Sequence, residues 1–292
     1  MIDRGRGGSA ACQVLALAGL IATGLAISAS AAASVTPTGA RASQPSGAPV
    51  RLPAVSATAR GGTSPRSWRA DTRPLAGKII GIDPGHNGRN WTDPAFLDRR
   101  VWNGREWEAC DTTGTETDGG YTEARFTFNV ATYLAADLRR LGARVVMTRH
   151  NNHGVGPCVT ARARILDRAR ANVAIDIHAD GGPATGRGFT VLEPVADGPN
   201  DKVIRSSIRF GRAVHAALLA HTRIPISDYY GHDGYIFRND LAGLNLTTVP
   251  KVLIECGNMR NATDAGLLVL GRVQRNIAKA LAAAIVRFLT GR

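Results

Sequence analysis

The sequence is poor in aromatic side chains and in acidic residues. Phe, Trp and Tyr make up 5% of the 292 residues, and 23 acidic residues stand against 36 lysines and arginines, which gives a formal net charge of +13. A surface with this charge attracts polyanions. Proteins that bind nucleic acid combine basic residues with stacking aromatics or carry a recognisable motif, and this sequence does neither. The composition therefore argues against a nucleic-acid partner.

Long apolar runs are also scarce, and the one that stands out lies near the N-terminus. Arg4 and Arg6 precede an apolar stretch over residues 10–27, and small residues follow it in the pattern Ala-x-Ala. This order is typical of a secretory signal peptide, so we expect residues 1–34 to be removed on export. An uncleaved membrane anchor is the alternative, but the Gly and Ala content of the run weakens a permanent span. We expect no stable membrane insertion after the signal is removed.

The next segment, residues 35–75, lacks the apolar periodicity of helices and strands. It is rich in Pro, Ser, Thr, Ala, Gly and Arg, so it buries too little apolar surface to offset the entropy cost of ordering. We expect a disordered linker there. The remaining residues 76–292 have the length of one domain with one core, and they contain no internal repeat. The sequence thus predicts a single folded domain, which we expect to be a monomer.

Cysteine is scarce as well, since only Cys110, Cys158 and Cys256 remain after the expected signal peptide. In an oxidising compartment two of these three are expected to pair. Cys110 and Cys158 lie in polar, Gly-rich segments, whereas Cys256 ends an apolar run. The preferred disulfide therefore joins Cys110 to Cys158, and three free thiols are the alternative.

Strand and helix patterns alternate along the domain. Short apolar runs predict strands over residues 78–82, 144–148, 171–178, 188–193 and 251–255. Apolar residues at helical spacing predict helices over residues 123–141, 160–170, 202–222 and 271–289. This alternation predicts an α/β protein with a mixed, largely parallel central sheet that helices cover on both faces.

Side chains that bind metals or transfer protons lie where the predicted strands end. His86 follows the first strand by four residues, His178 ends the third strand, and Glu255 ends the last. The carboxyl ends of parallel strands meet at one edge of a sheet, and Glu123, at the start of a helix, can face the same edge. Two imidazoles and one carboxylate form a ligand set of catalytic zinc sites, which leave the fourth position to water.

We therefore predict one zinc ion held by His86, Glu123 and His178. Glu255 is expected to accept a proton from the metal-bound water, because a carboxylate that closes an apolar run is costly to bury unless it is paired or functional. Glu123 has the least support, since a helix dipole alone favours a glutamate in the first turn. Three carboxylates are alternatives for the third ligand: Glu106, Glu108 and Glu116.

Several sequence blocks around these residues resemble one enzyme family and follow its order. They are residues 78–88, which contain Asp-Pro-Gly-His, and residues 122–124, 145–149, 162–164, 175–181, 252–258 and 261–264. The chain resembles the zinc-dependent N-acetylmuramoyl-L-alanine amidases of bacterial cell walls, in particular the actinobacterial type with a single catalytic domain. The blocks cover nearly the whole predicted domain.

The resemblance implies hydrolysis of the amide bond between the lactyl group of N-acetylmuramic acid and L-alanine, in peptidoglycan or in muropeptides. It implies the same three zinc ligands and the same general base. The polar neighbours Asn87, Asp180 and Asn258 are then expected to contact the substrate. An enzyme of this kind is secreted or periplasmic and associates with the cell wall.

Two segments have open roles. The insert over residues 89–120 contains Trp91, Trp102 and Trp107, which either pack the insert onto the domain or stack on sugar rings of the substrate. The aromatic and polar residues of 228–246 either contact the substrate or form a hairpin or irregular loop that packs on the sheet edge.

Two other functions fit parts of the sequence. A zinc carboxypeptidase on a related scaffold would act on peptidoglycan stem peptides, but it is expected to show an H-x-x-E pair, and Glu123 is far from His86 in the sequence. A non-catalytic wall-binding relative would have lost site residues, whereas all four are present here. The sequence therefore favours the amidase.

Overall fold

The computed structural model describes residues 73–291 of the chain. The expected signal peptide lies outside these residues, and so does the expected linker apart from its last three residues. Leu75 is fully buried, and its backbone N–H donates to the carbonyl oxygen of Leu141 at 3.0 Å. The folded domain therefore includes Leu75, which the composition assigns to the linker.

Six strands form the central sheet. They are β1 (Ile79–Pro84), β4 (Arg144–Met147), β5 (Val173–Asp180), β6 (Thr190–Pro194), β7 (Tyr235–Arg238) and β8 (Lys251–Asn258). Their order across the sheet is β4-β1-β5-β8-β6-β7, and every neighbouring pair is parallel except β6 and β8. The predicted fold class is confirmed. The four-residue edge strand β7 is absent from the predicted strands.

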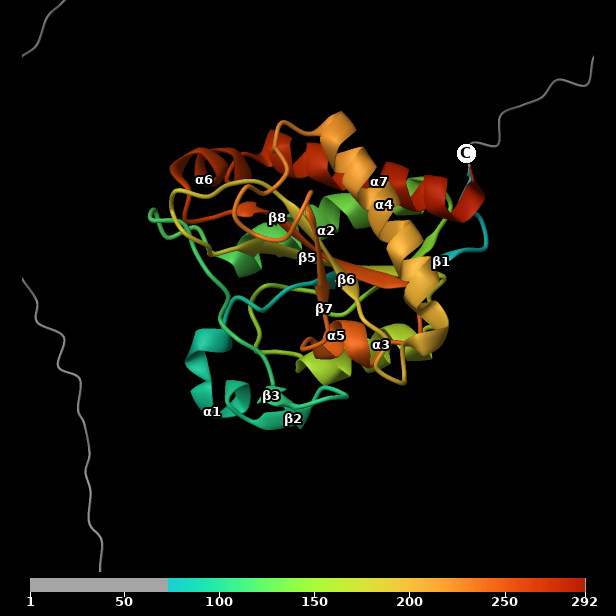
Figure 1. Ribbon diagram of the computed structural model, residues 1–292, viewed down its shortest axis with the longest axis horizontal. Helices are drawn as coiled ribbons and strands as arrows, with labels where there is room; N and C mark the ends of the chain where they lie inside the picture. The colour runs from blue at the N-terminus through green and yellow to red at the C-terminus, as the bar shows by residue number, and fades with distance from the viewer. Residues whose placement is uncertain (1–72, 292) are drawn as a thin grey trace, which may run out of the picture. The chain divides into compact units, whose positions relative to one another are not determined.

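Helices cover both faces of this sheet, as Figure 1 shows. They are α1 (Pro94–Leu97), α2 (Glu123–Arg140), α3 (Val159–Arg168), α4 (Ile204–His221), α5 (Ala242–Asn245), α6 (Ala262–Leu268) and α7 (Gly271–Thr290). Helices α2, α4 and α7 lie on one face, and α3 and α5 lie on the other. Helix α2 begins at Glu123 because the side chain of Thr122 accepts a hydrogen bond from the backbone N–H of Arg125, which caps the helix. Among the helices of residues 73–291, none is long and apolar enough to cross a membrane.

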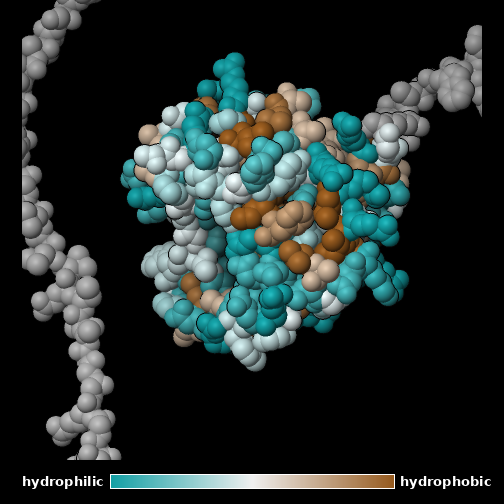
Figure 2. Space-filling model, in the orientation of Figure 1, coloured by the Kyte–Doolittle hydropathy of each residue, from teal (hydrophilic) through white to brown (hydrophobic). Residues whose placement is uncertain are grey.

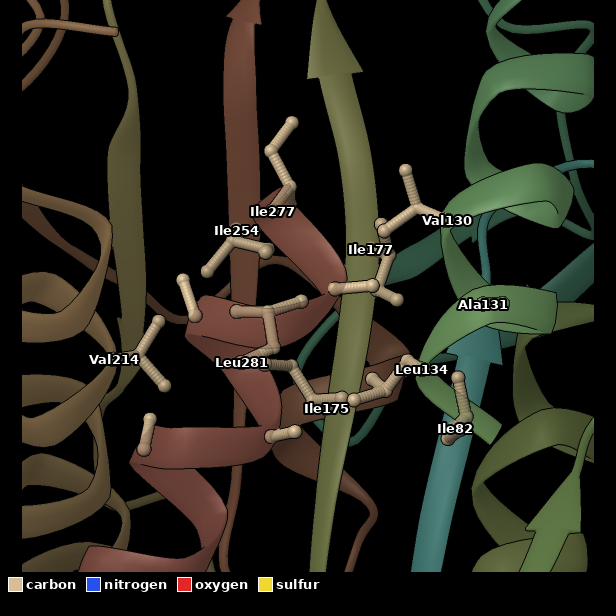
Figure 3. Packing of buried hydrophobic residues seen from close by; sticks show 14 of the residues in the cluster. Ile82, Val130, Ala131, Leu134, Ile175, Ile177, Val214, Ile254, Ile277 and Leu281 are labelled. Atoms are coloured by element: carbon tan, nitrogen blue, oxygen red, sulfur yellow. The ribbon is translucent and has the colours of Figure 1, made fainter. Parts of the chain in front are cut away.

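The two faces of the sheet differ in character, because successive residues of a strand point to opposite faces. Figure 3 shows the apolar face, where Ile82, Ile175, Ile177 and Ile254 pack against side chains of α2, α4 and α7. On the face toward α3 and α5, the same three central strands carry charged or titratable residues. These are Asp83, Asp176, His178, Lys251 and Glu255. The apolar face holds the main core, and the polar face leads to the site.

The insert over residues 89–120 forms α1 and a hairpin of β2 (Arg100–Trp102) and β3 (Trp107–Ala109). Its tryptophans Trp91, Trp102 and Trp107 are 68%, 47% and 58% exposed, so they do not pack the insert onto the domain. Leu97 and Cys110 of the insert are buried instead, and the insert joins the domain where the backbone N–H of Val159 at the start of α3 donates to the carbonyl oxygen of Cys110. Stacking of the tryptophans on sugar rings of the substrate stays a prediction.

The segment over residues 228–246 packs on the sheet, as one of its two predicted roles requires. It contains β7, which pairs in parallel with β6 at the sheet edge, and α5, which lies on the same face as α3. Tyr235 of β7 stacks on His215 of α4 with ring centroids 4.4 Å apart. Two parts of the segment lie near the candidate site described below: Tyr229, which contacts Asp180, and residues 241–244, which line the cavity beside the histidines.

Candidate active site

The structure brings His86, Glu123 and His178 together at the carboxyl edge of the sheet. One ligand atom from each residue lies within 4.8 Å of the other two. His86 Nε2 is 3.1 Å from Glu123 Oε2, and His178 Nδ1 is 2.8 Å from Glu123 Oε1. Within residues 73–291, no other group of three His, Cys, Asp or Glu side chains is arranged to hold a metal, so Glu106, Glu108 and Glu116 do not replace Glu123.

The turn after β1 fixes His86. His86 has a φ of 58°, which is uncommon for a residue with a side chain. Two buried arginines hold the backbone in this shape: Arg162 donates to the carbonyl oxygens of Pro84 and His86, and Arg149 donates to those of Pro84 and Gly85. The guanidinium groups thus satisfy carbonyl groups that no strand partner reaches.

Backbone donors hold Glu123 in place. The N–H of Thr115 donates to Glu123 Oε2 at 3.0 Å, and the N–H of Ala179 donates to Oε1 at 3.1 Å. Gly114 lies directly beside them, since a Cβ on this glycine would be 2.8 Å from Glu123 Oε2 and 2.7 Å from His86 Cδ2. The N-terminus of α2 also favours a negative charge at this position. The carboxylate therefore faces both imidazoles with little freedom to turn.

Each imidazole turns one nitrogen toward Glu123 and the other toward an outer acceptor. His86 Nδ1 lies 3.1 Å from the carbonyl oxygen of Thr112, and His178 Nε2 lies 3.3 Å from Asp176 Oδ1. Histidines that bind metals show this arrangement, because the outer acceptor fixes the tautomer that leaves the inner nitrogen free to coordinate. The residues present therefore fit a metal ion on chemical grounds.

The charges in the site shift the pKa values of its members. Burial lowers the pKa of His86, but the carboxylates of Glu123 and Asp111 outweigh it and raise the value to about 9. Burial likewise opposes protonation of His178, and Asp176 and Glu123 raise its pKa well above the ordinary value. For Glu123, burial alone would raise the pKa, but the two histidines lower it overall. The site is thus strongly attractive to positive charge, either protons or a metal ion.

Glu255 lies beside the three ligands as the register partner of His178 across β5 and β8. Its Oε2 is buried and has no hydrogen-bond partner among the described residues. Burial, together with repulsion from Glu123 and Asp180, raises the pKa of Glu255 to about 8, although His178 opposes this. An unpartnered buried carboxylate oxygen is costly, so its retention beside two histidines indicates a chemical role.

The three expected substrate contacts are placed differently. Asn258 is fully buried, and its amide donates to the carbonyl oxygens of Pro183 and Gly186. The prediction that Asn258 contacts the substrate is therefore wrong, because its side chain holds the loop after β5. The side chain of Asn87 forms hydrogen bonds with the backbone of Gly88 and Gly156. Its contact with the substrate stays a prediction.

Asp180, the third of these residues, accepts a hydrogen bond at 2.7 Å from the hydroxyl of Tyr229. Tyr229 in turn lies against Gly182 and Gly186, where a Cβ on either glycine would meet the tyrosine ring. Burial and the carboxylate of Asp180 raise the pKa of Tyr229, and the charge of Glu255 adds to the rise. The sequence indicates Tyr229 only as one of several aromatic residues in its segment.

Cys110, Cys158 and Cys256 are free thiols in the structure, and all three are buried. Burial raises the pKa of Cys110 to about 12, and the neighbouring Cys158 thiol adds to the rise. The backbone N–H of Val159 donates to the carbonyl oxygen of Cys110 at 2.8 Å, so the two cysteine segments run side by side. The Cys110–Cys158 disulfide stays a proposal, for which this proximity is favourable.

A cavity of about 240 Å³ borders both histidines. Its lining includes Asp176 of β5, Glu108 of β3 and Leu244 of α5, but neither Glu123 nor Glu255. It therefore lies on the α3 and α5 side of the histidines. Figure 2 shows that this face of the molecule is hollowed between the part that carries α6 and the part that carries α1, β2 and β3.

Comparison with known proteins agrees with this fold and site. Residues 80–287 match the family described as N-acetylmuramoyl-L-alanine amidase (Amidase_3), and the chain belongs to this family. It is accordingly a hydrolase that cleaves the amide bond between N-acetylmuramic acid and L-alanine. Membership of this family argues against the zinc carboxypeptidase, which was the alternative enzyme in the sequence analysis.

Two of the similar proteins are mycobacterial. The chain is 40% identical over 222 residues to the N-acetylmuramoyl-L-alanine amidase Rv3717 of Mycobacterium tuberculosis, which covers 74% of this chain and 88% of that protein. The crystal structure of the amidase Ami1 from Mycobacterium smegmatis is 40% identical, covers 75% of this chain and 99% of its own, and superposes with a TM-score of 0.70. A germination-specific amidase of Bacillus subtilis is 25% identical over 240 residues, which are 77% of this chain and 85% of that protein. The chain is thus an amidase of the actinobacterial type.

Proposed function

We propose that the chain hydrolyses the lactyl–L-alanine amide of peptidoglycan with one zinc ion held by His86, Glu123 and His178. The unpartnered Oε2 of Glu255, buried beside these ligands, is the observation that carries the mechanism. A zinc ion bound there supplies a Lewis acid that brings the pKa of a bound water close to neutrality. The other steps belong to the side chains of this domain.

Glu255 acts as general base and then as general acid. It takes a proton from the attacking water and returns it to the nitrogen of L-alanine as the amide bond breaks, so the carboxylate ends the cycle as it began. Its position in the middle of β8, between β5 and β6, keeps it fixed relative to His178. Burial makes it a stronger base than a solvated glutamate, because the raised pKa of about 8 reflects a greater affinity for the proton.

Glu123 and the two histidines would bind the zinc ion and fix its position. Their outer contacts to Thr112, Asp176 and the backbone N–H groups of Thr115 and Ala179 hold the ligand atoms before a metal arrives. Such preorganisation avoids rearrangement during the reaction. Asp180 follows His178 by two residues on β5 and accepts a hydrogen bond from Tyr229, which supports the proposal that these two residues contact the stem peptide or the glycan.

The direct test uses the purified chain with muramyl dipeptide and with isolated sacculi. Mass spectrometry should detect release of the free L-alanyl peptide in the presence of zinc, and addition of a chelator should abolish it. The matched control is Glu255→Gln, which preserves shape but cannot accept the proton. Release of peptide at an undiminished rate by this variant, or no release by the unaltered chain with zinc, contradicts the proposal.

The site of action follows from the N-terminal pattern and the relatives. An arginine-flanked apolar run with an Ala-x-Ala motif supports export, and the relatives are N-acetylmuramoyl-L-alanine amidases by name. The net charge of +13 supports attraction to anionic wall polymers. The enzyme is therefore proposed to act as a secreted or periplasmic, wall-associated monomer.

A further inference from the structure

Five charged side chains are buried together on the α3 and α5 face of the sheet. Three are acidic and two are basic, and none is more than 6% exposed: Asp83, Asp111, Asp176, Arg162 and Lys251. Removing this many charges from water is expensive, and buried ion pairs add little net stability compared with apolar side chains of the same volume. Such a group is therefore weakly explained by folding alone.

Lys251 is at the centre of the group and is fully buried. Its ammonium lies 2.7 Å from Asp83 Oδ2 and 3.0 Å from Asp176 Oδ2, so it bridges β1 and β5 from the first residue of β8. Gly243 of α5 covers it closely, since a Cβ there would lie 3.1 Å from Lys251 Nζ. The lysine is thus locked between two carboxylates and a helix backbone.

Both ends of the group reach the candidate metal ligands. At one end, the second oxygen of Asp176 lies 3.3 Å from His178 Nε2. At the other end, Asp83 Oδ1 accepts from Arg162 at 3.1 Å, and Arg162 lies 3.3 Å from Asp111 Oδ2.

The path from Asp111 to the first histidine is short. Asp111 Oδ1 is 3.6 Å from His86 Nδ1, and Arg162 also donates to the carbonyl oxygen of His86 at 2.8 Å. A continuous chain of charged contacts therefore runs behind the site from His178 to His86.

We propose that this chain is a positioning device for the metal site, in which Lys251 and Asp176 set the ring orientation and tautomer of His178. Asp176 Oδ1 lies 3.3 Å from Nε2, which favours the tautomer with the proton on Nε2 and leaves the lone pair of Nδ1 on the side of Glu123. Lys251 neutralises Asp176 and fixes its plane. The inference rests on the metal site of the proposed function, but it does not depend on which amide is cleaved.

If the network only stabilised the fold, substitutions in it would have a different effect. They would lower the folding stability but leave the zinc affinity of the folded protein unchanged. Outer partners of ligating histidines typically contribute 10–100-fold in metal affinity or activity. The two explanations therefore separate on zinc affinity measured with protein that circular dichroism shows to be folded.

The experiment compares Asp176→Ala and Asp176→Asn with the unaltered chain by chelator competition for zinc. The alanine variant should bind zinc 10–100-fold more weakly. The asparagine variant should lose less, because its carbonyl oxygen still accepts from Nε2–H. Glu193→Gln is the matched control, since Glu193 is also a buried carboxylate of the sheet but contacts neither histidine. It should bind zinc normally.

Lys251 needs a paired substitution. Lys251→Met alone leaves two buried carboxylates without a counter-ion, whereas Lys251→Met with Asp83→Asn removes a charge of each sign. The double variant should bind zinc more weakly than the unaltered chain. With Co²⁺ in place of zinc, its visible spectrum and that of Asp176→Ala should shift, because the histidine geometry has changed.

Zinc affinity and Co²⁺ spectrum equal to those of the unaltered chain, in folded Asp176→Ala and in the double variant, overturn the proposal. Weaker zinc binding by these variants supports it even if the unaltered chain fails to cleave muramyl dipeptide, and in that case only the proposed function falls. Where the amidase assay works, Asp176→Ala should lower kcat more than it raises KM, since the proposal has Asp176 act through His178.

Discussion

Gly85 offers the sharpest test of the site geometry, because its lack of a side chain makes room for His178. A Cβ at this position would lie 2.5 Å from Nε2 and 2.6 Å from Nδ1 of the His178 ring. Ordinary van der Waals contact begins near 3.4 Å, so in Gly85→Ala the imidazole has to move by about 1 Å. The backbone of Gly85 does not have the positive φ that would itself strain an alanine. The substitution therefore acts through the ring alone.

The expected effect is large on the metal and on turnover. A displacement of 1 Å is about half of the ~2.0–2.1 Å length of a zinc–nitrogen bond, and a misplacement of this size costs roughly 100-fold in rate. We expect zinc affinity to fall by at least ~10-fold and release of L-alanyl peptide from muramyl dipeptide by about 100-fold. Chelator competition and mass spectrometry measure the two quantities.

The matched control is Gly266→Ala in α6, where a Cβ meets nothing within 4 Å. This substitution should leave zinc affinity unchanged and stabilise the helix by up to ~1 kcal/mol. Unaltered zinc affinity in folded Gly85→Ala would show that His178 is not the ligand or that its ring has a different position, and the reasoning about the site would then be wrong.

Three further predictions concern the ligands, the base and one buried carboxylate. Glu255→Gln should keep its zinc by metal analysis and lose roughly 10²–10⁴-fold in turnover; a variant that retains full rate removes Glu255 from the mechanism. His178→Ala should lose most of its zinc, and a stoichiometric zinc content in this variant would exclude His178 as a ligand. Burial raises the pKa of Glu193 to about 7, although Arg212 opposes this, so folding stability should fall as the pH rises from about 4.5 to about 7. Glu193→Gln should then be more stable than the unaltered chain by ~1–2 kcal/mol at pH 8, after discounting for solvent screening, and by little at pH 4. Denaturant unfolding at the two pH values measures this, and an equal difference at both would count against the raised pKa.

The sequence predicts the fold well where apolar periodicity is strong. Helix α2 and strands β5 and β8 lie within a few residues of their predicted ranges, because one apolar face decides both the type of element and its place in the core. Strands of three or four residues give a weaker signal, and of these only β4 was predicted. The hairpin of β2 and β3 and the edge strand β7 were not predicted, since pairing rather than periodicity defines them.

The site was predictable to the extent that strand ends reveal it. His86, His178 and Glu255 follow from their places after strands, whereas the role of Asp176 depends on Lys251 and Asp83 lying beside it. These side chains meet because β1, β5 and β8 are neighbours in the sheet, and the order of the strands in the sheet cannot be read from the sequence. A signal did exist, because isolated charges at every second position of apolar strands indicate one polar face. Asn258 was misjudged because its partners are carbonyl groups of a distant loop.

Strand β8 has a consequence for when the enzyme becomes active. Lys251 and Glu255 lie four residues apart on this strand, on the same face, and a slip of one residue would turn both to the other face. The strand is inserted between β5 and β6 and is the last of the sheet in chain order. On the export proposed above, the first histidine would cross the membrane long before the base. Hydrolysis could then begin only after nearly the whole domain has crossed and closed, which would delay any damage to the wall until export is complete.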